Sequence, residues 1–130
     1  MDGAIKINHA ERGESMDKFI KNLEHEAVFS LQGQVDYLPG QIVSKTLAQN
    51  SALSLTLFAF EKGEEISSHE SDGDAMVVAL DGTGQVTVDG KPFTLKAGDT
   101  IVMPARKPHA VYAPERFKML LIVVFPKAAK

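Results

Sequence analysis

The sequence predicts an all-β fold, an antiparallel barrel or sandwich of the jelly-roll type, preceded by a short N-terminal helix or arm. From about residue 34 onward, short runs of aliphatic, aromatic and β-branched residues alternate with turns rich in Gly, Asp and Pro, as strands alternate with hairpin loops. No helical period runs through this part of the chain. The runs amount to about eight to ten closely spaced strands.

The length and composition favour a single soluble domain. With 130 residues and 14.1 kDa the chain is long enough for a hydrophobic core. We expect an N-terminal arm or helix over residues 1–33 and a barrel over residues 34–130. The net charge of −3 argues against a nucleic-acid partner, which normally selects a basic patch. The absence of cysteine excludes disulfides and thiolate ligands and suits a reducing cytoplasm.

No stretch of the sequence predicts contact with a membrane. The N-terminal MDGAIKINHAERGES lacks the basic and then apolar layout of a secretory signal. The longest apolar run, MLLIVVF at residues 119–125, is far shorter than the roughly 20 residues of a membrane helix. We therefore expect a cytoplasmic protein.

The first element is expected between residues 15 and 31. Phe19, Leu23 and Ala27 follow one another at helical spacing, and Ser15 is a candidate N-cap. This pattern predicts one short helix, or alternatively an arm that lies on the barrel or on a partner.

The strands are expected in the following order. The first two are Gln41–Ala48 and Ala52–Phe60, and EKGEE separates them from Ala75–Leu80 and Gln85–Gly90. Two Asp-Gly pairs, in DGTG between the latter two runs and in VDGKP after them, predict tight hairpins. The remaining strands are expected in FTL, AGDTIVMP, HAVYA and RFKMLLIVVF. The last of these is apolar at successive positions, which predicts burial on both faces.

Two histidines are the candidate functional residues. His69 and His109 each lie beside a turn and on a predicted strand, so they could meet inside one barrel. Residues two apart on a strand share a face, which would place Ser71 beside His69. Imidazole is a common metal ligand, but a stable site normally needs three or four protein ligands.

The stretches around these histidines resemble the two motifs of the cupin superfamily. The first motif places a second histidine two residues after the first, then a glutamate, between two glycines. The corresponding residues here are Gly63, His69, Ser71, Ala75 (or Met76 in the longer spacing) and Gly82. The second motif contains Gly, Pro-x-Gly, His and Asn, which correspond here to Gly98, Pro104, Arg106, His109 and Ala113. The resemblance covers about residues 40–125 and implies a cupin barrel.

The resemblance also implies a reduced metal site. Metal-binding cupins use three histidines and a glutamate to hold Fe, Mn, Ni, Cu or Zn, and this chain keeps only His69 and His109 of those four. The resemblance therefore implies at most one weakly held divalent metal. Asp72 or Asp74 could assist from the turn, Glu70 could do so from a bulged strand, and water or a substrate carboxylate could complete the shell.

The same substitutions predict a pocket. Ser71 and Ala75 are smaller than the residues they replace, which leaves volume near His69 for a ligand or a water. Inward-facing Phe58, Phe60 and Met103 are expected to line it, although each also suits a plain core position.

Two classes of function remain open. One is an enzyme on a small polar molecule, with His69 and His109 as catalytic or metal-binding residues. The other is a non-catalytic, metal-free module that binds or senses a small molecule. The alternatives to a functional site are that the two histidines have no function and that ESDGD is only a solvated acidic turn. Unpaired strand edges and the apolar segment Phe19–Leu31 further predict a homodimer.

Overall fold

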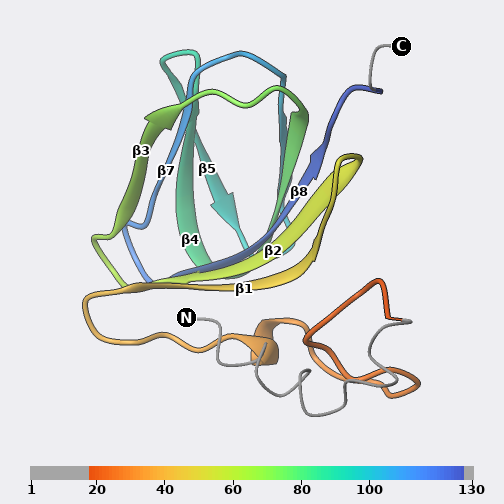
Figure 1. Cartoon of the computed structure of the whole chain (residues 1–130). Helices are drawn as coiled ribbons and strands as arrows, with labels where there is room; N and C mark the ends of the chain where they lie inside the picture. Colours follow the sequence, from red (N-terminus) through yellow and green to blue (C-terminus); the bar gives the residue numbers. More distant parts are fainter. Residues whose placement is uncertain (1–17, 128–130) are drawn as a thin grey trace.

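The computed structural model describes residues 18–127 and confirms the all-β prediction (Figure 1). The described residues form eight strands and one 3-10 turn: η1 (Gln32–Gln34), β1 (Ile42–Gln49), β2 (Leu53–Phe60), β3 (Glu65–His69), β4 (Asp74–Val88), β5 (Lys91–Lys96), β6 (Thr100–Met103), β7 (His109–Tyr112) and β8 (Phe117–Val124). Within this range no helix is long and apolar enough to cross a membrane.

All the strand pairs are antiparallel, and the sheet curls into a half-closed barrel (Figure 1). Its strand order is β1-β2-β8-β4-β7-β3, with β5 and β6 also paired to β4. The first half of β4 pairs with β8 and β6, and its second half pairs with β5 and β7. This long strand therefore joins the two halves of the barrel.

The hairpin predicted at DGTG is wrong, because these residues lie inside β4. Gly82 has a φ of +75° in the extended ladder, and a Cβ there would overlap the carbonyl oxygen of Arg116. A Cβ on Gly84 would overlap the ring of Phe117 in the same way. These glycines thus allow β8 and the loop before it to approach β4 closely. From sequence alone, a glycine that serves such an approach cannot be distinguished from a glycine of a turn.

The hairpin predicted at VDGKP is confirmed. Val88 and Lys91 are paired across a two-residue loop, and Asp89 and Gly90 both have positive φ, 52° and 83°. Two central residues of positive φ are the mark of a type I′ turn, whose twist matches that of the flanking strands.

The interior of the barrel holds the larger hydrophobic cluster. Its buried members are Phe60, Ala75, Val77, Ala79, Val86, Leu95, Met103, Val111, Ala113, Phe117, Met119 and Val123. They come from both halves of the sheet, so closing the curl removes them all from water.

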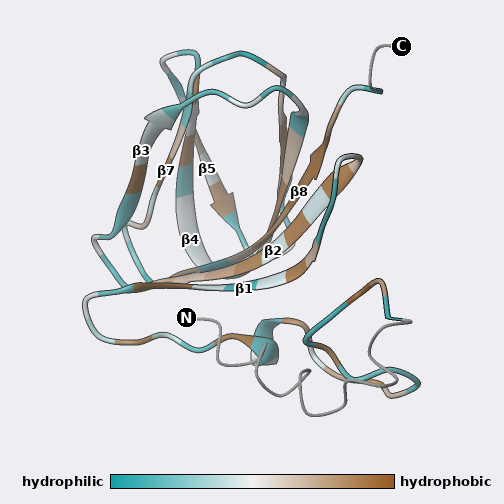
Figure 2. Cartoon of the chain, in the orientation of Figure 1, coloured by the Kyte–Doolittle hydropathy of each residue, from teal (hydrophilic) through white to brown (hydrophobic). Residues whose placement is uncertain are grey.

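The outer face of the β1-β2-β8 region carries a second cluster. Leu57 and Ala59 alternate along β2 with the inward Phe58 and Phe60, and they are fully buried although they point away from the interior. Val35, Leu23 and Leu31 of the N-terminal segment cover this face. Figure 2 shows hydrophobic residues along β2 and β8. Figure 1 shows the N-terminal segment running alongside β1. The prediction that the last strand is apolar on both faces agrees with this arrangement.

The N-terminal segment is an arm and not a helix over residues 18–31. The amide of Lys21 donates to the carbonyl of Leu47 at 2.7 Å, and the side-chain amide of Asn22 donates to Thr46 O at 2.7 Å. Asn22 and Glu26 also have positive φ, which a right-handed helix excludes. A short isolated helix would be only marginally stable in water. The hydrogen bonds to β1 therefore decide the conformation of this segment, although its apolar residues have helical spacing. The candidate cap Ser15 lies outside the described residues.

Candidate functional site: paired histidines at the barrel rim

His69 and His109 lie directly opposite each other at the end of the β3–β7 pair. Their ring centroids are 4.3 Å apart and the rings meet edge to face at 66°. A register shift between Ile66 and His69 sets this alignment. The structure thus brings together two candidate residues that are forty positions apart in the sequence.

Backbone carbonyls orient both imidazoles in the same way. His69 Nδ1 lies 3.0 Å from the carbonyl of Ser67, and His109 Nδ1 lies 3.1 Å from the carbonyl of Lys107. A carbonyl oxygen only accepts, so each Nδ1 must carry the proton and donate it. In the neutral rings, each Nε2 is then left with its lone pair free to accept a hydrogen bond or to bind a metal.

The two rings differ in burial. His69 is exposed, whereas His109 is 5% exposed. Burial lowers the pKa of His109 below its ordinary value, and the neighbouring His69 lowers it further, while the bond to Lys107 O opposes both effects. His109 is therefore a neutral imidazole near pH 7.

The loops that flank the histidines hold each other in place. The amide of Arg106 donates to Ser71 O at 2.8 Å, and the amide of Ala105 donates to Asp74 Oδ1 at 2.8 Å. Figure 1 shows both loops crossing the end of the barrel away from the arm. β3 ends at His69, so Ser71 lies in the loop beyond it and does not share a strand face with His69 as the sequence predicted. The hydroxyl of Ser71 is bonded there to the backbone of Gly73. Asp72 and Glu70 are exposed.

Four of the five predicted pocket residues lie in the barrel interior, and Ser71 does not. Ala75 and Met103 are Cα partners across β4 and β6, and both are at most 2% exposed. Phe60 is fully buried, and half-buried Phe58 lies beside it with ring centroids 6.0 Å apart. These four side chains pack into the same interior cluster, so a role in ligand contact stays a prediction.

The described side chains around the pair are too few to hold a metal ion tightly by themselves. Over residues 18–127, no three His, Cys, Asp or Glu side chains lie where they could share a metal. Asp74 uses one carboxylate oxygen on Ala105. Two imidazoles fall short of the three or four protein ligands that hold transition metals firmly, so the side chains described do not fit a tight site by themselves.

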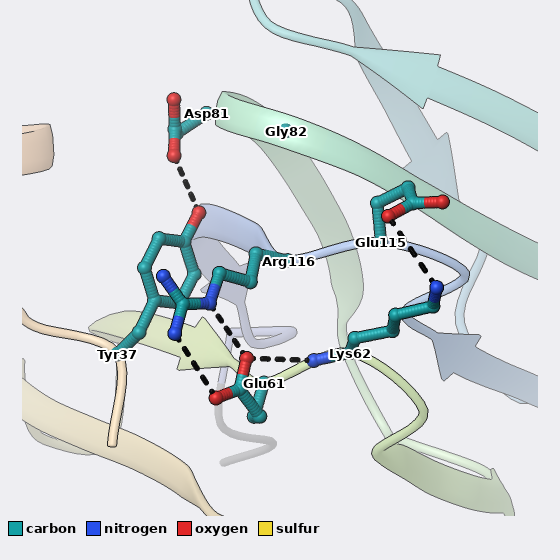
Figure 3. Close-up of a pocket in the computed structure, with 7 residues that line it drawn as sticks. All are labelled: Tyr37, Glu61, Lys62, Asp81, Gly82, Glu115 and Arg116. Carbon is teal, nitrogen blue, oxygen red and sulfur yellow. Dashed lines mark hydrogen bonds and ion pairs between the residues drawn. The ribbon is translucent and has the colours of Figure 1, made fainter. Parts of the chain in front are cut away.

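A second candidate is a charged cleft of about 570 Å³ (Figure 3). Its lining residues are Tyr37, Glu61, Lys62, Asp81, Gly82, Glu115 and Arg116. Arg116 binds Glu61 through two nitrogens at 2.7 and 3.2 Å, and Lys62 lies 3.9 Å from Glu115. Figure 3 shows these side chains directed at one another across the cleft.

Tyr37, in the segment between η1 and β1, contributes its ring and hydroxyl to this cleft. Its hydroxyl donates to Asp81 Oδ2 at 2.5 Å, and the cations of Arg116 and Lys118 lie 5.0 and 4.9 Å from its ring centroid. Burial raises the pKa of Tyr37, and the bond to Asp81 raises it further. Since its charged groups largely satisfy one another, the cleft is better explained as the contact between the segment before β1 and the barrel. Sequence reasoning missed it because its partners are 44 and 55 residues apart and form no local pattern.

Comparison with known proteins places this architecture in a family. Residues 56–125 match the Cupin domain family. None of the curated proteins compared with the chain matches it.

Solved structures agree. A conserved protein of unknown function from Streptococcus pyogenes is 46% identical, with a TM-score of 0.83 over 85% of this chain and 97% of that one. A cupin superfamily protein from Desulfitobacterium hafniense is 34% identical, with a TM-score of 0.79 over 82% and 98%. A cupin 2 conserved barrel domain protein from Leptotrichia buccalis is 49% identical, with a TM-score of 0.72 over 74% and 47%. With a matching curled barrel and a family match over more than half of its length, the chain belongs to the cupin family.

Proposed function

We propose that the chain binds a small polar molecule at the barrel rim through His69 and His109. The observation that carries the proposal is the shared orientation of the two imidazoles, which turns an acceptor nitrogen of each away from its backbone partner. A cupin barrel is compatible with small-molecule binding, and a pair of oriented acceptors selects ligands that carry hydroxyl or amine donors.

Burial of His109 supports a second candidate function, proton transfer to or from the bound molecule. A neutral imidazole near pH 7 is the form that acts as a general base, and the lowered pKa of His109 favours that form. The enzyme and the binding module therefore share one site and differ in whether bound ligand is turned over.

We propose that any divalent transition metal at the pair is held weakly. Two imidazole ligands would leave the remaining positions to water or to the bound molecule. We expect protein purified without an affinity tag and dialysed to retain less than about a tenth of an equivalent of Fe, Mn, Ni, Cu or Zn. A full equivalent that survives dialysis and is lost in His69→Ala would overturn this expectation.

The binding proposal is tested by nuclear magnetic resonance with a library of small polar molecules. Ligands should shift the imidazole signals of His69 and His109, and His109→Ala should abolish binding. The matched control is His25→Ala, an exposed histidine of the arm that bonds Ile20 O and should leave binding unchanged. Binding that survives loss of both His69 and His109 would sink the proposal. Turnover of a bound ligand, lost in His109→Ala, would identify an enzyme.

The exposed apolar surface supports a homodimer as the working assembly. In the arm, Val28 is fully exposed and Phe19 is 86% exposed, and on the outer sheet face Val102 and Val124 are 54% and 57% exposed. Exposed apolar side chains that gather into a patch mark interaction surfaces. A second copy of the chain is the partner that we propose, since each copy then covers apolar surface on the other.

A further inference from the structure

Arg106 adopts a backbone conformation that suits glycine. Its φ is +63°, a left-handed value in which the Cβ of a bulky residue is crowded. In the cupin motif that this stretch resembles, the corresponding position is a glycine. Arg106 therefore strains the backbone at a position where glycine would not. Strained positions of this kind concentrate at functional sites.

The loop that carries Arg106 is fixed against the histidine pair. The amide of Arg106 is bonded to Ser71 O, two residues after His69. The next residue, Lys107, accepts the bond from His109 Nδ1 through its carbonyl. The loop of Arg106 thus lies on the same rim as both imidazoles, because its backbone is bonded to the loop after His69 and to the ring of His109.

Within the described part of the chain, the Arg106 guanidinium and His109 Nε2 are both without a hydrogen-bond partner on this rim. The side chain of Arg106 is exposed, and none of the residues 18–127 gives its guanidinium a hydrogen bond or an ion pair. His109 is 95% buried, and no described residue is hydrogen-bonded to its Nε2. Lys107, by contrast, faces Asp89 at 3.5 Å. A buried acceptor without a partner is costly, so a bound group that donates to it is favoured.

We propose that the rim binds a small hydroxy acid, with Arg106 pairing the carboxylate and the histidines accepting a hydrogen bond from the hydroxyl. The proposal rests on the proposed function and deepens it by naming the ligand class. A planar guanidinium matches a carboxylate through two parallel hydrogen bonds. An imidazole whose Nδ1 donates to a carbonyl offers only an acceptor at Nε2, which selects a hydroxyl. Exposed Glu70 and Asp72 in the facing turn repel an anion, so we expect dissociation constants of about 1 mM.

The test uses lactate, propionate and propane-1,2-diol as probes, with affinities measured by nuclear magnetic resonance. We expect lactate to bind, propionate to bind about tenfold more weakly for want of the hydroxyl, and the diol to bind least. Arg106→Gly should weaken lactate binding at least tenfold and at the same time raise the melting temperature by a few degrees, because it relieves the left-handed strain. Arg106→Lys should retain more affinity than Arg106→Asn, which tolerates positive φ but removes the charge.

Lys96→Gln is the matched control for loss of a cation. Lys96 pairs with Thr83 of β4, whereas His109 pairs with Val88 of the same strand. Five residues of strand separate Thr83 from Val88, a distance of about 16 Å. The Lys96→Gln change should leave lactate binding unchanged. Unaltered lactate affinity in Arg106→Gly, or wild-type protein that binds neutral polyols but not lactate, would overturn the hydroxy-acid assignment alone. Loss of polyol binding in His109→Ala would meanwhile uphold the proposed function.

Discussion

His69 and His109 face each other across two paired strands, yet one imidazole is exposed and the other is almost fully buried. Burial couples the protonation of His109 to folding. Desolvation favours its neutral form in the folded chain, whereas the unfolded chain places it in water.

Stability should therefore depend on pH through His109. Because its folded pKa is lowered, the unfolded chain binds the extra proton more readily, and the stabilisation is present above about pH 6.5, the ordinary histidine value. It is lost as the pH falls from there towards the folded pKa. Chemical denaturation at pH 7.5 and 5.5 measures this loss. His109→Gln should reduce it, whereas His25→Gln at an exposed position should not. An equal loss in both variants would contradict the assignment.

Gly82→Ala should destabilise the fold by about 3 kcal/mol, because the residue has positive φ and its new Cβ would overlap Arg116 O. Gly90→Ala is the control for backbone strain alone. Gly90 has a φ of +83° but no atom within 4 Å of the added Cβ, so its cost should be about 1 kcal/mol. Equal costs, measured by denaturant titration, would show that close approach at Gly82 is unimportant.

Leu57→Ala tests whether the arm makes the outer sheet face part of the core. Leu57 is fully buried beneath residues that include Leu23 and Leu31, and its truncation should lower the free energy of unfolding by about 3 kcal/mol. Thr94→Ala, on exposed β5, should change it by less than about 0.5 kcal/mol. A cost below about 1 kcal/mol at Leu57 would mean that the arm leaves this face in solution.

Tyr37→Phe should cost about 1 kcal/mol, since it removes the hydroxyl bonded to half-buried Asp81. Tyr112→Phe removes a hydroxyl from an exposed side chain on β7 and should be neutral. Thermal melts of the two variants give the comparison. If the cleft instead only binds a ligand and does not stabilise the fold, both variants should have the melting temperature of the wild type.

The assembly is tested by multi-angle light scattering, which should give twice 14.1 kDa. Val28→Lys combined with Phe19→Lys places charge on the exposed side of the arm and should shift the mass towards the monomer. A wild-type mass of 14 kDa at micromolar concentration would refute the dimer.

The sequence predicted the barrel well because strand patterns and the Asp-Gly turn at Asp89 are local features. It also indicated that His69 and His109 could meet, because each lies beside a turn on a strand of the same barrel, and the structure places them opposite each other. It failed at DGTG, where the glycines leave room for Arg116 and Phe117. These two residues are distant in the sequence, so no local pattern reveals the contact. It likewise left open whether residues 18–31 form a helix or an arm, because hydrogen bonds to β1 decide that choice.

The long strand β4 has a consequence for how the molecule comes apart. Its residues Val77 and Val86 are fully buried in opposite halves of the sheet, yet they belong to one uninterrupted backbone segment. Neither half can release β4 without disturbing the other. Amide hydrogens at both positions should therefore exchange with solvent only through global opening, so that the two halves melt as one cooperative unit.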